Sequence, residues 1–163
     1  FVGIVDSSNK LYPNAMMFLS NYIKDDSKLD FVCGTVKKDG RIYGGYNPEK
    51  IMTKFNIIPS SVVGFFIKRS SLKKIGYLNL KYKIQSDYDL LYRMIVKHNL
   101  KGVNSSGNEV FGDLGSSGFS KKHSFFKTLF NEIKIRNDNG QNKISLIYII
   151  IGRSFKKFLN NLF

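Results

Sequence analysis

The sequence predicts an α/β domain that is followed by a basic helical tail. Short apolar runs rich in β-branched residues, such as 1–5 and 61–68, alternate with stretches in which apolar residues recur every three or four positions, such as 13–24 and 87–98. Of the 163 residues, 42% are hydrophobic and 14% are aromatic, which is enough apolar surface for a folded core. Residues 121–163 differ from the rest, because they hold nine basic and only two acidic residues.

The individual elements follow from local signals along the chain. Pro13 suits the first turn of a helix, Asp39-Gly40 is typical of a hairpin turn, and Gly76 is a helix stop. Before Gly76 the patterns predict a buried strand at 1–5, a helix at 13–24, strands at 31–36 and 42–46, a helix at 48–55, a strand at 61–68 and a helical turn at 70–75. After it they predict a helix at 87–98, a strand at 100–103, a Gly- and Ser-rich loop at 104–120, and helices at 122–136 and 143–162.

Charge and cysteine content restrict the partners and the compartment. With 26 Lys or Arg and 12 Asp or Glu, the net charge is +14, which favours an anionic partner. Nucleic acid is not expected, because the sequence holds no nucleic-acid-binding motif and its aromatic residues are not interleaved with the basic ones. Cys33 is the single cysteine, so no internal disulfide can form, and a reducing cytoplasm is predicted. No apolar run approaches the ~20 residues that a membrane span needs.

Three segments share an order and spacing that point to one family. Residues 1–15 read FVGIVDSSNKLYPNA, a strand that ends in an acidic turn before a helix that starts at proline. Residues 75–78 read IGYL and lead to SDYDLLYR at 86–93, where a glycine turn, an acidic pair and an arginine stand at fixed offsets. Residues 111–120 read FGDLGSSGFS. Together these segments resemble the catalytic domain of family 2 glycosyltransferases, which have the GT-A fold.

The resemblance implies a fold and an activity class. It implies a partial GT-A mixed sheet flanked by helices, with 1–120 as the acceptor-side half of the catalytic domain and 121–163 as a basic amphipathic helical tail. It implies transfer of a sugar, with inversion, from a nucleotide-sugar donor to a glycan or lipid-linked acceptor in polysaccharide or cell-surface glycan synthesis. The strands that bind the nucleotide in this family would precede residue 1. The alternative is a non-catalytic or truncated module that acts as a binding or scaffold protein, or that needs a partner half.

The motif at 86–93 supplies the implied catalytic residue. By resemblance, Asp87 is the base that takes the proton of the acceptor hydroxyl. Asp89 and Arg93 stand one helical turn apart and can pair, and the resemblance gives them a substrate-binding role. From the residues alone, Ser86 and Asp89 also fit a capping box in which Asp87 only complements the helix dipole. A further implied contact to the acceptor or diphosphate is the loop of Gly115, Ser116 and Ser117.

The acidic turn after the first strand is the implied metal site. Asp6 matches one acidic residue of the family's metal-binding loop, and Ser8 or Asn9 stands where the family usually has its direct metal ligand. Oxygen ligands of this kind, completed by the donor diphosphate, suit Mg²⁺ or Mn²⁺. On turn preference alone, the same residues form a simple strand-ending turn.

The tail at 121–163 has two interpretations. Its apolar residues recur at helical spacing beside lysines and arginines, which is typical of helices that lie on anionic membrane surfaces. That interpretation would place the protein peripherally on the inner face of the membrane. The same spacing fits a helix that packs on the domain or on a missing half. The sequence leaves both interpretations open.

Overall fold

The computed structural model describes residues 1–3, 5, 9–45, 51, 63–83, 85–115 and 124–162. Residues 161 and 162 are described by their backbone alone. Within these ranges the fold is mixed α/β, with two mixed sheets and five α-helices, which confirms the predicted α/β class. The strands are β1 (Val2–Gly3), β2 (Lys10–Leu11), β3 (Phe31–Cys33), β4 (Thr35–Lys38), β5 (Arg41–Tyr43), β6 (Phe65–Ile67), β7 (Gly102–Asn104) and β8 (Val110–Asp113). The helices are α1 (Ala15–Asp25), α2 (Arg69–Ile75), α3 (Ser86–Tyr92), which a π-helical turn (Arg93–Lys97) continues, α4 (Phe125–Asp138) and α5 (Lys143–Leu162).

Each sheet combines parallel and antiparallel neighbours. The first has the order β1-β6-β3-β7, in which β6 runs antiparallel to β1 and β3, and β7 runs parallel to β3. The second has the order β2-β8-β4-β5, in which β8 runs parallel to β4 and antiparallel to β2.

The chain leaves the first sheet at Gly34, so the strand predicted at 31–36 is two strands. A Cβ atom at Gly34 would lie 2.3 Å from the ring of Phe111, so the backbone can approach that ring only at a glycine.

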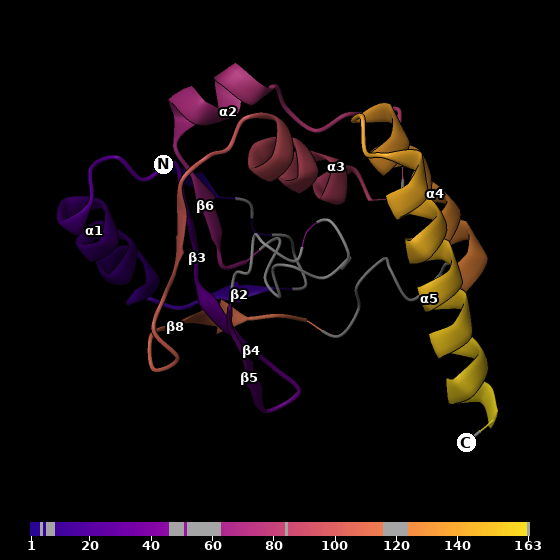
Figure 1. The fold of residues 1–163 in the computed structure, drawn as a ribbon. Coiled ribbons are helices and arrows are strands. Elements are labelled where there is room, and N and C mark those ends of the chain that lie inside the picture. Colours follow the sequence, from indigo (N-terminus) through magenta and orange to yellow (C-terminus); the bar gives the residue numbers. More distant parts are fainter. Residues whose placement is uncertain are drawn as a thin grey trace.

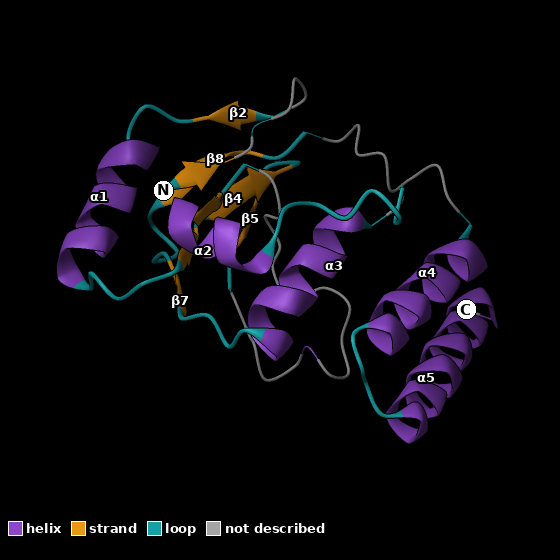
Figure 2. Cartoon of the chain, turned by 90° about the horizontal axis from the view of Figure 1, so that it is seen from above, coloured by secondary structure: helices purple, strands orange, loops and turns teal. Residues whose placement is uncertain are grey.

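Helices α1 and α3 lie on opposite sides of the first sheet, and the α4–α5 pair lies beyond α3 (Figures 1 and 2). Alternate side chains of β3 supply the two cores, as expected for a sheet that is covered on both faces. Val32 packs on the α1 side with Ala15, Leu19, Leu29, Phe66 and Phe111. Phe31 and Cys33 pack on the α3 side with Phe65, Ile67, Tyr88, Leu91, Tyr92 and Met94.

Helices α4 and α5 are joined by a buried polar group that we call the hairpin network: Glu132, Arg136, Gln141 and Arg153. Glu132 and Arg136 are fully buried and form an ion pair at 3.0 Å. Arg136 also donates to the side-chain oxygen of Gln141 and to the carbonyl of Ile51, each at 2.8 Å. Glu132 accepts a second ion pair from Arg153 of α5. The network therefore fixes α5 on α4.

The hairpin network also contacts α3. The Tyr92 hydroxyl donates to the side-chain oxygen of Gln141 at 2.9 Å. The Arg136 guanidinium lies over the rings of Tyr88 and Tyr92, with 5.5 and 5.7 Å to the ring centres. Desolvation of the buried guanidinium lowers the pKa of Arg136, and the facing aromatic rings give the cation a favourable environment.

The helical periodicities located the helices closely. Helix α5 has the predicted bounds, and α1, α2 and α4 lie within a few residues of theirs. Gly76 ends α2 with φ of +82°, a conformation that favours glycine. Ser124 caps α4, because its Oγ accepts a hydrogen bond from the Lys127 backbone nitrogen at 3.3 Å. The helix predicted at 87–98 is α3 together with the π-helical turn.

The loop predicted at 104–120 is wrong in part, because it contains strand β8. Phe111 of β8 is fully buried among residues of α1 and the first sheet, and β8 joins β2 to β4. A Cβ atom at Gly112 would lie 2.2 Å from the carbonyl oxygen of Lys10, so this glycine allows close strand pairing. The glycine content of the segment indicated a loop, whereas Gly112 belongs to a strand that pairs closely with β2.

The first strand is also less buried than predicted. Val2 is 37% exposed and Val5 46% exposed, because β1 stands at the end of its sheet and pairs only with β6 among the described strands. The helix predicted at 48–55 lies outside the described residues, apart from the buried Ile51. In the described part of the chain, no helix is long and apolar enough to cross a bilayer.

Candidate active site

The motif at 86–93 places Asp87 in the first turn of α3. Its carboxylate is exposed, and its Oδ1 accepts a hydrogen bond from the backbone nitrogen of Tyr88 at 2.9 Å. Nitrogens at a helix start stabilise a carboxylate in this way. Within the described residues, no Lys or Arg forms an ion pair with Asp87. Its oxygens therefore remain available to accept a proton from a bound molecule.

The residue before this motif is held in an unfavourable conformation. Gln85 precedes α3 with φ of +71°, a left-handed conformation that side-chain-bearing residues rarely adopt. Both polar atoms of its amide are buried, and no described residue hydrogen-bonds them, which costs free energy. Gln85 rather than Ser86 is the N-cap residue and no side-chain cap bond forms, so the alternative interpretation of Ser86 and Asp89 as a capping box does not hold. Strain of this kind is often found at functional sites, and here it adjoins Asp87.

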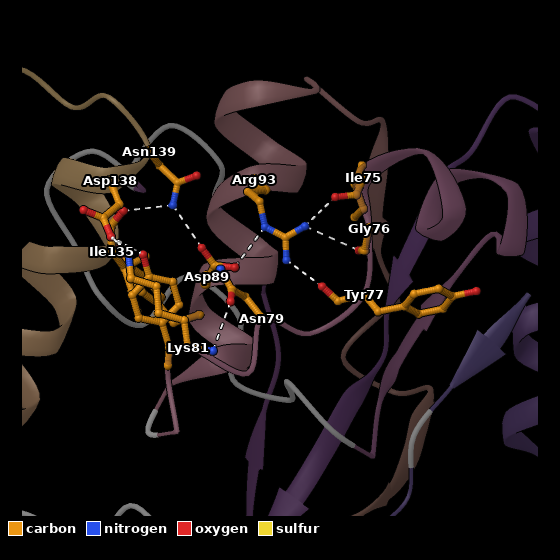
Figure 3. Close-up of polar contacts among 12 residues, drawn as sticks. Ile75, Gly76, Tyr77, Asn79, Lys81, Asp89, Arg93, Ile135, Asp138 and Asn139 are labelled. Carbon is orange, nitrogen blue, oxygen red and sulfur yellow. Dashed lines mark hydrogen bonds and ion pairs between the residues drawn. The ribbon is translucent and has the colours of Figure 1, made fainter.

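Asp89 has a different environment from Asp87, although only Tyr88 stands between them in the sequence. It is 1% exposed, and both of its oxygens are engaged within the protein. One oxygen accepts from Arg93 Nε at 2.9 Å, and the other accepts from Asn139 Nδ2 at 3.0 Å (Figure 3). The predicted pairing of Asp89 with Arg93 across one helical turn is confirmed.

Arg93 uses its remaining donors on the loop that follows α2. It donates to the carbonyl oxygens of Ile75, Gly76 and Tyr77, at 3.4 Å for Gly76 and 2.8 Å for Tyr77 (Figure 3). We call this arrangement, with Asp89, the α3 clamp. The clamp joins the glycine turn of the motif to its acidic pair. It makes Arg93 a positioning residue, and the substrate-binding role of Asp89 and Arg93 stays a prediction.

A hollow of about 380 Å³ lies beside the α3 clamp and is lined by Asn79, Lys81, Tyr82, Asp89, Arg93, Lys97, Asp138 and Asn139. Lys81 and the Tyr82 hydroxyl both donate to Asp138 Oδ2 at 2.7 Å. These bonds hold the pKa of Asp138 below its usual value, whereas burial and the same carboxylate raise the pKa of Tyr82. Sequence analysis missed Asp138 and Asn139, because no local pattern indicates partners some fifty residues away.

The pairing of β2 with β8 brings the first motif to the third. Asn9 Oδ1 accepts from the backbone nitrogen of Gly115 at 2.8 Å. The Tyr12 hydroxyl donates to Asp113 at 2.7 Å, and this bond raises the pKa of Tyr12. The described ends of the implied metal turn and the implied Gly-Ser loop are therefore in contact. The four predicted residues next to them lie outside the described residues: Asp6, Ser8, Ser116 and Ser117.

The described residues hold no group of three or more His, Cys, Asp or Glu side chains that could bind a metal ion. No protein-family model matches the chain, and no curated protein matches it.

Proposed function

We propose that the chain is the acceptor-side part of an inverting, nucleotide-sugar-dependent glycosyltransferase, with Asp87 as the catalytic base. The observation that carries this proposal is that the two carboxylates of the motif at 86–93 differ in burial and in hydrogen-bond partners. Asp89 is buried and fully engaged, whereas Asp87 is exposed and free of ion pairs among the described residues. Only Asp87 can therefore exchange a proton with a bound acceptor.

The reaction assigned to Asp87 is general base catalysis. As the acceptor hydroxyl oxygen attacks the anomeric carbon, its proton passes to the Asp87 carboxylate. The bond between the anomeric carbon and the donor diphosphate breaks, and the nucleoside diphosphate leaves with its electron pair. Attack from the side opposite the leaving group inverts the anomeric centre. The α3 clamp keeps Asp87 in place during the step, because Arg93 joins α3 to the loop at 75–77.

The donor side of the proposal rests on the segment that contains Asp6 and Ser8. A Mg²⁺ or Mn²⁺ ion bound there would neutralise charge on the leaving diphosphate. The contact between Asn9 and Gly115 supports this part of the proposal, because it joins the described ends of the two implied segments. The GT-A assignment is supported by a mixed sheet with α1 on one side and α3 on the other. We assign residues 1–120 to this catalytic part.

Calorimetric titration with UDP, GDP and CDP, each with and without Mn²⁺, tests the proposal. We expect one nucleotide to bind in a Mn²⁺-dependent manner, and we expect Asp6→Ala to abolish the metal dependence. Asp25→Ala, which removes an exposed carboxylate at the end of α1, is the matched control and should leave binding unchanged. If the folded chain binds none of the nucleotides, it does not act alone as a glycosyltransferase. A binding or scaffold module would then be favoured.

A further inference from the structure

Helix α5 carries an apolar stripe that the fold leaves uncovered. Six large side chains on one face of the helix are each 55–72% exposed. They recur at spacings of three and four residues, so they form one continuous row along the helix. We call this row the α5 stripe: Ile144, Ile147, Tyr148, Ile151, Phe155 and Phe158.

The α5 stripe faces away from the rest of the protein. The opposite side of α5 holds the residues that pack inward, because Leu146 and Ile149 are buried and Arg153 pairs with Glu132 of α4. The α4–α5 pair is itself the outermost layer of the fold (Figure 2). One face of α5 therefore packs on α4, and the opposite face is apolar and exposed. The packing interpretation of the tail and the membrane interpretation are thus compatible.

The charge around the α5 stripe is uniformly positive. Helix α5 holds no acidic residue, and exposed lysines lie on both sides of the stripe, Lys156 on one side and Lys143 and Lys157 on the other. The two acidic residues of α4 are held in ion pairs, Glu132 with arginines and Asp138 with Lys81. An apolar row with lysines at its margins complements a bilayer surface whose headgroups are anionic.

We propose that α5 lies in the surface of an anionic phospholipid bilayer, with the α5 stripe among the upper acyl chains and its lysines at the headgroups. The helix would lie parallel to the membrane, because its inner face is fastened to α4. A second copy of the chain is a poorer partner, since each copy carries a net charge of +14. This proposal does not rest on the glycosyltransferase proposal, because it concerns a different surface and needs no nucleotide.

Cosedimentation with vesicles tests the proposal. The full chain is mixed with vesicles of phosphatidylcholine alone or of phosphatidylcholine with phosphatidylglycerol. We expect binding to the anionic vesicles only. The pair Ile151→Ser and Phe155→Ser should lower the partition coefficient roughly tenfold or more, since it removes two inserted side chains. The matched control pair, Met16→Ser and Met17→Ser, removes two exposed apolar side chains of α1 and should leave binding unchanged.

Lysine variants test the electrostatic part. Lys156→Gln with Lys157→Gln should lower binding to anionic vesicles by about 30-fold, at roughly 1 kcal/mol for each lysine. Lys73→Gln with Lys74→Gln in α2 changes the charge equally and should have little effect. The proposal would be overturned by equal binding to neutral vesicles, by equal losses in the control pairs, or by no binding at all. A dimer that the Ile151 and Phe155 changes dissociate, without vesicle binding, would also overturn it.

A fluorescence reporter gives a readout that does not depend on destabilising changes. The chain has no tryptophan, so Phe155→Trp introduces a single probe within the α5 stripe. Its emission should shift to the blue when anionic vesicles are added, because the indole enters an apolar layer. Tyr77→Trp, at an exposed position outside the hairpin, should show no shift. Equal shifts at both positions, or none at position 155, would contradict the proposal.

Discussion

The α3 clamp and the hairpin network are built on the same motif, an acidic residue followed four positions later by arginine. In the α3 clamp, Asp89 and Arg93 are 2% and 13% exposed in their side chains, and the spare donors of Arg93 reach three carbonyls of a loop. In the hairpin network, Glu132 and Arg136 are fully buried, and a second arginine is added from α5. The first pair holds a loop beside a candidate catalytic residue, and the second joins two helices.

The two pairs differ in the burial of the arginine and in the partners that its remaining donors reach. A buried ion pair is costly to desolvate, so removing one partner leaves an uncompensated charge in the core. In the α3 clamp the carboxylate is also buried, but Arg93 keeps partial access to water and directs its other donors to backbone carbonyls, so this pair also fixes the chain that precedes α3. We therefore expect the hairpin network to control stability and the α3 clamp to control the position of Asp87.

The largest effect is expected in the hairpin network. Glu132→Ala leaves Arg136 and Arg153 without their shared carboxylate, and should lower the free energy of unfolding by about 3–5 kcal/mol. Denaturant unfolding measures this. Asp26→Ala, which removes a partly exposed carboxylate paired with Lys101, is the control and should cause a far smaller loss. Similar losses in both variants would show that burial does not distinguish the ion pairs of Glu132 from the pair of Asp26 with Lys101.

A smaller loss is expected in the α3 clamp. Arg93→Ala leaves the buried Asp89 without its cation and three carbonyls without their donor, and should cost about 2 kcal/mol. Arg93→Lys should restore only part of this, because an ammonium group cannot reproduce the planar fork. Unfolding measurements on both variants, with the exposed Lys97→Ala as control, check the ranking. A lysine that restores full stability would contradict the proposed geometry.

Alkaline pH should weaken the packing of Tyr88 against the hairpin network. Burial raises the pKa of Tyr88, which lies under Arg136, above its usual value of about 10. The unfolded chain therefore loses this proton first, so the contribution of Tyr88 to stability is complete below about pH 10 and decreases as pH rises above it. Unfolding at a series of alkaline pH values should show this decrease, and Tyr88→Phe should reduce its slope. An unchanged slope in Tyr88→Phe would show that Tyr88 does not cause the loss of stability at alkaline pH.

The smallest effect is expected at Ser86. Because Gln85 is the N-cap residue of α3 and no side-chain cap bond forms, Ser86→Ala should change the free energy of unfolding by less than about 0.5 kcal/mol. Ser124→Ala, which removes the cap of α4, should cost about 1 kcal/mol and is the positive control. A loss at Ser86 equal to that at Ser124 would restore the capping-box interpretation.

The sequence predicted the fold correctly where a hydrophobic periodicity runs over many residues. It failed where tertiary packing decides a structure that the local composition does not indicate. The twenty residues of α5 keep one pattern throughout, so both of its bounds were predicted. Strand β8 was missed because Gly112 and the glycines and serines around the strand indicate a loop, and only the burial of Phe111 reveals it. The break at Gly34 was missed because close approach to that same ring leaves no mark in the local sequence.

The candidate site was predictable within one helix and not between elements. The pairing of Asp89 with Arg93 follows from their spacing and is confirmed. The carbonyl partners of Arg93 and the contact of Asn139 with Asp89 depend on the packing of α2 and α4 against α3, which no local pattern specifies. The pair of Glu132 and Arg136 has the same spacing, and charged residues within an otherwise apolar helix face were the signal that could have found it.

Comparing Asp87→Asn with Asp89→Asn tests the central claim most directly. Each variant is measured for its free energy of unfolding and for sugar transfer from the donor that calorimetry identifies. We predict that Asp87→Asn keeps the stability of the unmodified chain and lowers transfer by about 10²–10⁴-fold, because the base is lost. Asp89→Asn should instead lower stability by about 2 kcal/mol, because the α3 clamp loses its charge. Transfer that survives Asp87→Asn, or equal destabilisation by the two variants, would contradict the proposed division of the two carboxylates.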